Sequence, residues 1–243
     1  MSPEILIALL LLIVAFFYAS VGHGGASGYL AVFTLFNVHL SVYKPVVLLL
    51  NIIIAGISFI QFYRAGHFKW SLCWPFLITS IPFAYWGSHF ASNDLLYKKI
   101  LGFALLFPVI RLMGWGPKEK VQQKPIILPA ALCIGAIIGF IAGFLNIGGG
   151  IFLSPVLILL AWSSIKESAA VSSLFIVCNS IAGLLAVNTN GFNFTASIYL
   201  WIAAAVIGGL SGSYLGSHRF RQGTIRYLLS AVLCFASIKL IFF

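Results

Sequence analysis

The chain has 243 residues, of which 61% are hydrophobic and 7% charged, and its mean hydropathy of +1.09 excludes a soluble globular domain. We expect an all-α membrane protein, because an apolar run of about 20 residues crosses a bilayer as a helix. The net charge of +10 would suggest nucleic acid in a soluble protein. Here the Lys and Arg residues lie mostly in predicted loops, where they contact lipid headgroups, so we expect membrane lipid and no nucleic acid as a partner.

Apolar runs separated by polar breaks predict eight to ten membrane segments. The opening run lacks the basic region of a secretion signal, so we expect it to be kept as the first helix. The second and seventh runs are too short to cross a bilayer, and each directly follows a glycine-rich break, so each is predicted to be a half-helix. In chain order the runs are 5–21, 29–36, 46–63, 71–87, 95–112, 126–144, 151–162, 169–187, 197–215 and 225–243.

The two glycine-rich breaks lie at matching places in the two halves of the chain. The first is Gly22-His-Gly-Gly-Ala-Ser-Gly28, and the second is Asn146-Ile-Gly-Gly-Gly150. Non-helical backbone at bilayer depth is tolerated only where protein buries it or where it lines a cavity. Paired breaks inside apolar runs therefore predict a transporter with a central binding site.

Further landmarks repeat in the same order, which predicts an internal duplication. Asn51 matches Asn179, and the Gly-Ser-His triplet that ends at His89 matches the one that ends at His218. We expect a first transmembrane repeat over 1–113, a basic cytoplasmic linker over 114–125 and a second transmembrane repeat over 126–243. Each repeat should hold a glycine-broken hairpin or half-helix plus three to four transmembrane helices.

The distribution of Lys and Arg favours two inverted repeats. Cytoplasmic loops collect Lys and Arg, and the linker with Lys118, Lys120 and Lys124 is taken to be inside. If each half-helix folds back, the basic loops of both halves face the cytoplasm, whereas four crossings per repeat divide the charges evenly between the two sides. The inverted arrangement predicts an exterior C-terminus.

An anion is the favoured substrate, because the four carboxylates, Glu4, Asp94, Glu119 and Glu167, all lie at ends or in loops. Transporters of cations and protons commonly place ionisable residues inside the membrane. A helix N-terminus can instead hold an anion through its free N–H groups and its positive dipole end, and glycine lets that backbone approach a ligand closely. The alternative is that these glycines only allow close helix packing. The predicted substrate-binding residues are His23, Gly24, Gly25, Ala26, Ser27, Asn51, Asn146, Gly148, Gly149, Gly150, Ile151 and Asn179.

Some of these side chains leave two interpretations open. Asn51 and Asn179 interrupt apolar helices, so each amide contacts either a ligand or another helix. His23 has Ile147 as its counterpart in the second break. It is either an anion ligand or proton carrier, or an ordinary hydrogen-bonded loop histidine. No cofactor, catalytic residue or metal ligand is predicted.

The duplicated glycine breaks resemble those of the TauE/SafE sulfite exporter family, also called the toluene sulfonate uptake permease family. That family's motif is approximately Gly-x-Gly-Gly-Gly followed, after four intervening residues, by Pro. The second half gives Gly148-Gly149-Gly150 and Pro155 but lacks the first glycine, and the first half has Ala31 where the proline would fall. The resemblance covers nearly the whole chain. It implies transport of sulfite or of organosulfonates such as sulfoacetate across the bacterial cytoplasmic membrane.

We therefore expect a multi-pass secondary transporter of the bacterial inner membrane, not an enzyme, that holds a small sulfur-containing anion between its two glycine loops. The alternatives are an anion channel and a membrane-embedded enzyme with histidines as metal ligands. A homodimer, the direction of transport and the coupling ion are left open by the sequence.

Overall fold

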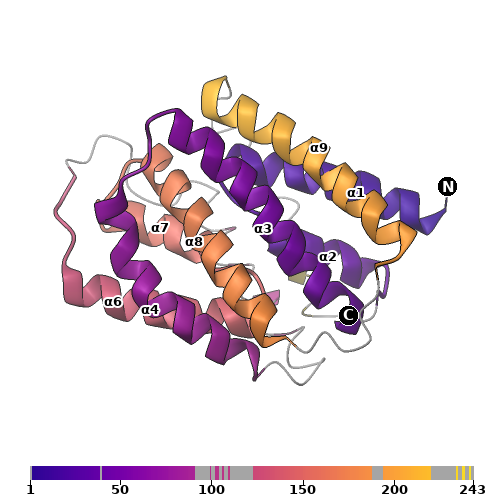
Figure 1. Ribbon diagram of the computed structural model, residues 1–243, viewed down its shortest axis with the longest axis horizontal. Coiled ribbons are helices and arrows are strands. Elements are labelled where there is room, and N and C mark those ends of the chain that lie inside the picture. The colour runs from indigo at the N-terminus through magenta and orange to yellow at the C-terminus, as the bar shows by residue number, and fades with distance from the viewer. Residues whose placement is uncertain are drawn as a thin grey trace.

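The computed structural model describes residues 2–38, 40–90, 123–187 and 194–219, together with 99, 102–103, 106, 109, 234, 237–238 and 241. Every element with given bounds in these residues is a helix (Figure 1). The predicted runs 95–112 and 225–243, and most of the linker 114–125, lie largely outside the described residues. The helices are α1 (Pro3–Ser20), α2 (Ala26–Leu35), α3 (Leu40–Arg64), α4 (Trp70–Ser88), α6 (Leu128–Leu145), α7 (Gly150–Leu159), α8 (Ile165–Ala186) and α9 (Ala196–His218).

Helix lengths confirm the division into long and short segments. Five helical stretches are long and apolar enough to cross a membrane, namely Pro3–Ser20, Tyr43–Arg64, Leu128–Leu145, Ile165–Ala186 and Ala196–His218. In contrast, α2 and α7 have 10 residues each, which gives each a length of about 15 Å. Large apolar side chains such as Ile78, Ile137 and Leu185 are more than half exposed. This is the surface of a helical protein surrounded by lipid.

Helices α3 and α8 form the antiparallel centre of the bundle (Figure 1). Near the middle of α3, Asn51 bonds to Ser180 of α8. Towards its end, Phe62 packs instead with Ala169, close to the start of α8. Positions that rise along α3 therefore meet positions that fall along α8.

Two parallel helix pairs flank this centre, α1 with α9 and α4 with α6 (Figure 1). Glycines at every fourth position bring the backbones together, as in other closely packed membrane helices. A Cβ atom on Gly208, Gly212 or Gly216 of α9 would meet the main chain of α1, at residues that rise in the same order. Gly139 and Gly143 of α6 lie likewise against the main chain of α4. Each pair joins one helix from before the linker to one from after it.

The half-helix α7 folds back beside α6. The main-chain N–H of Lys124, just before α6, donates to the carbonyl of Ala161, just after α7, over 2.8 Å. The same end of the bundle holds the start of α8, where Gln123 donates to the Glu167 carboxylate over 2.6 Å. Glu167 also pairs with Lys69. The hairpin of α6 and α7 therefore opens at the end where α8 begins.

The half-helix α2 folds back beside α1 in the same way, but towards the other end of the bundle. Phe33 near the end of α2 contacts Trp201 with ring centroids 5.1 Å apart, and the Trp201 indole donates to the Glu4 carbonyl at the start of α1. Phe33 also stacks on Tyr43 in the first turn of α3. Because α3 and α8 are antiparallel, the two hairpins open at opposite ends of the bundle.

Candidate functional site

The first glycine loop reverses the chain between α1 and α2. The N–H of His23 bonds back to the Tyr18 carbonyl over 2.9 Å, which closes the C-terminus of α1. Gly22 and Gly25 have φ values of 78° and 97°, a left-handed conformation that glycine adopts without steric cost. The break is shorter than the predicted 22–28, because α2 already begins at Ala26. Gly28 is a helical residue whose missing side chain makes room for Val14 and Tyr18.

The second glycine loop repeats this turn between α6 and α7. The N–H of Ile147 bonds back to the Ala142 carbonyl over 3.1 Å. Left-handed φ values recur at Asn146 and Gly149, in the places of Gly22 and Gly25. Asn tolerates this conformation better than most residues, which accounts for the absence of the motif's first glycine. Gly148 also has a left-handed φ of 70°, whereas its counterpart Gly24 does not, so the two turns agree at two equivalent positions and differ at a third.

Asn51 lies between the two loops. Its Oδ1 accepts a hydrogen bond from the N–H of Ala26, at the N-terminus of α2, over 3.3 Å. Its Nδ2 donates to Ser180 of α8 over 2.9 Å. A Cβ atom on Gly24 would collide with the Asn51 amide, and one on Gly148 would lie 2.5 Å from Asn51 Nδ2. The two loops thus meet at one amide in the middle of α3.

Asn179, the counterpart of Asn51 in the second half, does not connect the loops through its amide in the described part of the chain. Asn179 is 2% exposed and Asn146 is 0% exposed, and neither amide has a hydrogen-bond partner in the described part of the chain. Asn179 lies on the same face of α8 as Ile176 and Ser172, which contact Gly150 at the N-terminus of α7. Within the described residues, the main-chain N–H groups of Gly148, Gly149 and Gly150 also have no hydrogen-bond acceptor. Buried polar groups without partners are rare and costly in folded proteins.

His23 connects the first loop to α7 and α8. Its Nδ1 lies 3.0 Å from the Val21 carbonyl oxygen, and its Nε2 lies 3.2 Å from Ser154 Oγ on α7. Ser154 in turn donates to Ser172 of α8 over 2.8 Å. Gly24 and the loop residues after it are buried, whereas His23 is partly exposed.

The structure brings most of the predicted site residues together but separates two side chains from the rest. Ser27 hydrogen-bonds to the Tyr18 hydroxyl of α1 over 2.6 Å, and Ile151 belongs to the apolar core around α1, α2 and α3. These two residues offer the loops only their main chain.

Sequence reasoning missed Ser172, Ser173 and Ser180. Ser173 donates to the Gly22 carbonyl over 2.7 Å and so fixes the first loop. The sequence holds a signal for Ser172 and Ser180, because Ser168, Ser172 and Ser180 are spaced by multiples of four along an otherwise apolar run. Such spacing places them on one face of α8.

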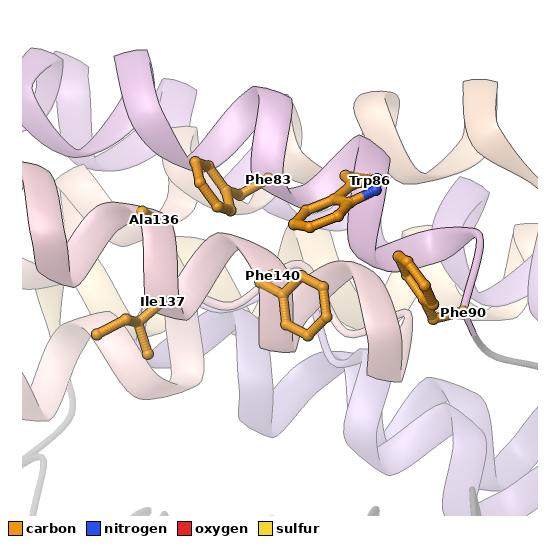
Figure 2. A pocket seen from close by; sticks show the side chains of 6 residues that line it. All are labelled: Phe83, Trp86, Phe90, Ala136, Ile137 and Phe140. Atoms are coloured by element: carbon orange, nitrogen blue, oxygen red, sulfur yellow. The ribbon is translucent and has the colours of Figure 1, made fainter.

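A separate cavity of about 350 Å³ lies on the outer surface between α4 and α6, away from the glycine loops (Figure 2). Phe83, Trp86 and Phe90 point towards Phe140 and Ile137 across this groove. Its lining is aromatic and aliphatic and gives an anion no counter-charge. The groove therefore suits a lipid chain better than a charged solute.

Comparisons with known proteins identify the family of the chain. The family model described as Sulfite exporter TauE/SafE matches residues 7–240, so the chain belongs to this family of membrane transporters. It is 30% identical to the probable membrane transporter protein y4hK of Sinorhizobium fredii, with 97% of each chain covered. It is 26% identical to the probable membrane transporter protein YdhB of Bacillus subtilis, with 87% of this chain and 88% of the relative covered.

A third relative is the probable membrane transporter protein MJ0441 of Methanocaldococcus jannaschii, which is 26% identical with 73% of this chain and 70% of the relative covered. No solved structure matches the chain. Membership of the family and the apolar helices together identify a multi-pass membrane transporter.

Proposed function

We propose that this member of the TauE/SafE family is a secondary transporter of small sulfur-containing anions, sulfite or organosulfonates such as sulfoacetate, in the bacterial cytoplasmic membrane. The choice of sulfur anions follows the description of the family. One structural observation carries the proposed site: two glycine loops meet at Asn51 and leave N–H and buried amide groups that have no partner among the described residues. An anion between the loops would supply the missing acceptors.

The proposed anion lies at the N-terminus of α7. The unpaired N–H groups there and the positive end of the helix dipole both favour negative charge. The amides of Asn146 and Asn179 add donors that have no acceptor in the described part of the protein. At the N-terminus of α2, by contrast, Asn51 already accepts from Ala26. The proposed site is therefore asymmetric, although the two loops share left-handed residues at two equivalent positions.

We also propose that the two halves are inverted repeats. The antiparallel contact of α3 with α8 supports this arrangement, because a two-fold axis in the membrane plane reverses equivalent helices. The opposite openings of the two hairpins support it as well. Alternating access would then move helix groups around the loops, which remain near the bilayer midplane.

The cytoplasmic side is assigned to the end of the bundle where α8 begins. Lys69, Lys124 and Lys166 gather there, beside Glu167. Positive charge in short loops marks the cytoplasmic face of a membrane protein. This assignment places the C-terminus outside if the run 225–243 crosses the membrane once.

Flux measurements on the purified protein in liposomes test the transport proposal. Saturable uptake of sulfoacetate, methanesulfonate or sulfite is expected, with carboxylates of the same size carried more slowly. Gly148→Ala should abolish uptake, because the new Cβ would enter the space of Asn51 Nδ2 at a φ of +70°. Gly56→Ala is the matched control, since a Cβ at Gly56 in α3 meets no atom within 4 Å. Equal uptake by both variants would show that the loops do not form the site.

The same preparation separates the alternative functions. An anion channel gives ohmic currents that do not saturate with sulfoacetate concentration. A histidine–metal enzyme binds metal stoichiometrically and turns over substrate in detergent. Either result, without saturable uptake, would replace the transporter proposal.

A further inference from the structure

We propose that His23 carries the coupling proton, so that the protein moves an anion and a proton together in the same direction. This inference rests on the proposed anion site. Its basis is the hydrogen-bond geometry that joins His23 to Ser154 and Ser172 across three elements of the fold.

The partners of the two imidazole nitrogens define which protons they carry. A carbonyl oxygen only accepts hydrogen bonds, so the contact with Val21 requires a proton on Nδ1 of His23. Ser154 has one hydroxyl proton, which it can give to Ser172 over 2.8 Å or to Nε2 of His23 over 3.2 Å. When Ser154 donates to Ser172, its oxygen can accept a proton from Nε2, so a protonated ring has an acceptor at both nitrogens.

The neutral form of His23 needs only the rotation of two hydroxyl groups. If Ser172 donates to Ser154, the Ser154 proton turns towards Nε2, which then accepts it. His23 is partly exposed, so the proton lost from Nε2 can leave to water. The serine pair thus satisfies both protonation states of His23 without moving a helix, as a group that takes up and releases a proton in each cycle requires.

No fixed negative charge compensates the imidazolium among the described residues. The titratable neighbours on α1 and α2 are Tyr18 and Tyr29, and α7 has no charged side chain. At the end of α9, beside the end of α1, His218 and Arg219 are exposed. The other charged side chains on the helices around the loop lie near helix ends: Glu4, Lys44, Arg64, Lys166 and Glu167, the last paired with Lys69.

The proposed anion is the counter-charge. Ser154 follows Gly150 by four residues, so both lie on the same face of α7, and the imidazole also lies near the Gly150 main chain. A buried cation without a counter-charge is costly, and so is a buried anion. Each therefore favours the binding of the other, and by linkage the effect is reciprocal. The second loop has Ile147 in the place of His23, so one proton site is expected per chain.

The test measures labelled sulfoacetate uptake and proton uptake, with a pH-sensitive dye inside the liposomes, in the same preparation. Both groups of sulfoacetate stay ionised between about pH 5.5 and about pH 8, where histidine titrates. The wild type should take up both, at least tenfold faster at the acidic end. His23→Gln, which cannot become a cation, should show no proton uptake and a flat pH profile. His89→Gln, on a ring that bonds to the Tyr85 carbonyl of its own helix, is the control and should match the wild type.

Ser172→Ala provides an independent second variant if His23→Gln does not fold. Loss of the acceptor for Ser154 should shift the midpoint of the pH profile to lower pH. Coupled proton uptake with these shifts supports the proposal. Saturable sulfoacetate uptake with a flat wild-type pH profile, or an unchanged profile in His23→Gln or Ser172→Ala, overturns proton coupling and leaves the anion site standing. Absence of any saturable sulfoacetate, methanesulfonate or sulfite flux overturns both.

Discussion

The unpaired amide of Asn179 gives a prediction in which stability and transport change in opposite directions. Asn179→Leu replaces a buried amide that has no hydrogen-bond partner among the described residues with an apolar side chain of similar size. An unsatisfied buried polar group costs about 1–3 kcal/mol, so the variant should be more stable than the wild type by about 1 kcal/mol or more in the absence of substrate.

The equivalent change at Asn51 should have the opposite effect on stability. Asn51→Leu leaves the N–H of Ala26 and the hydroxyl of Ser180 without their partner. Two orphaned buried groups correspond to a loss of about 2–6 kcal/mol. The two variants differ only in which member of the asparagine pair is removed, so each is the control for the other.

Transport should also distinguish Asn179→Leu from the wild type. A hydrogen bond from a neutral amide to an anion contributes about 1.5–3 kcal/mol. Its loss in Asn179→Leu should weaken the apparent affinity for sulfoacetate roughly 10- to 100-fold. Thermal unfolding followed by gel filtration in detergent, and uptake by liposomes over a range of sulfoacetate concentrations, measure the two effects. An Asn179→Leu variant that is destabilised, or that transports with wild-type affinity, would refute the assignment of this amide to the anion.

Three further predictions concern packing, topology and the charged end of the bundle. Gly212→Leu should reduce the yield of folded protein by separating α9 from the Phe16 carbonyl on α1, whereas Ile207→Leu on the exposed face of α9 should express normally. A reporter fused after Phe243 should be accessible from outside the cell, and a cytoplasmic signal would exclude the proposed topology. Glu167→Gln removes the ion pair with Lys69 and weakens the capping box with Ser164. The variant should therefore lose about 1 kcal/mol of unfolding free energy and unfold at a lower temperature at low salt. An unchanged unfolding temperature would contradict a stabilising role of Glu167.

The sequence predicted the helices and the glycine breaks well, because apolar length and glycine clusters are local signals. The runs 5–21 and 126–144 became α1 and α6 within a few residues, and the short runs became α2 and α7. The first break was predicted too long, since Ala26, Ser27 and Gly28 are polar or small and also fit the first turn of a helix. Small residues signal close approach, but they do not say whether the approaching atom belongs to a loop or to a helix.

The contacts of the site could not be read from the sequence alone. Asn51 and Asn179 occupy equivalent positions in the sequence, yet among the described residues Asn51 has hydrogen-bond partners and the Asn179 amide has none. One partner of Asn51 is Ser180, and the position equivalent to Ser180 in the first repeat is Ile52, which has no polar group to offer Asn179. The pairing of His23 with Ser154 joins positions that are 131 residues apart. Such pairings depend on the antiparallel packing of α3 against α8, which no local pattern encodes. The spacing of the serines predicts that they share a face of α8, but it does not predict which residues they contact.

The crossed pairing of helices restricts how the protein can change shape. Glycines with no room for a side chain hold α1 against α9 and α4 against α6, and each of these pairs takes one helix from either side of the linker. In the alternating-access cycle proposed above, each pair should therefore move as one unit that combines the two halves. Cutting the chain in the linker should thus yield fragments that work only when made together, each completing the other's framework.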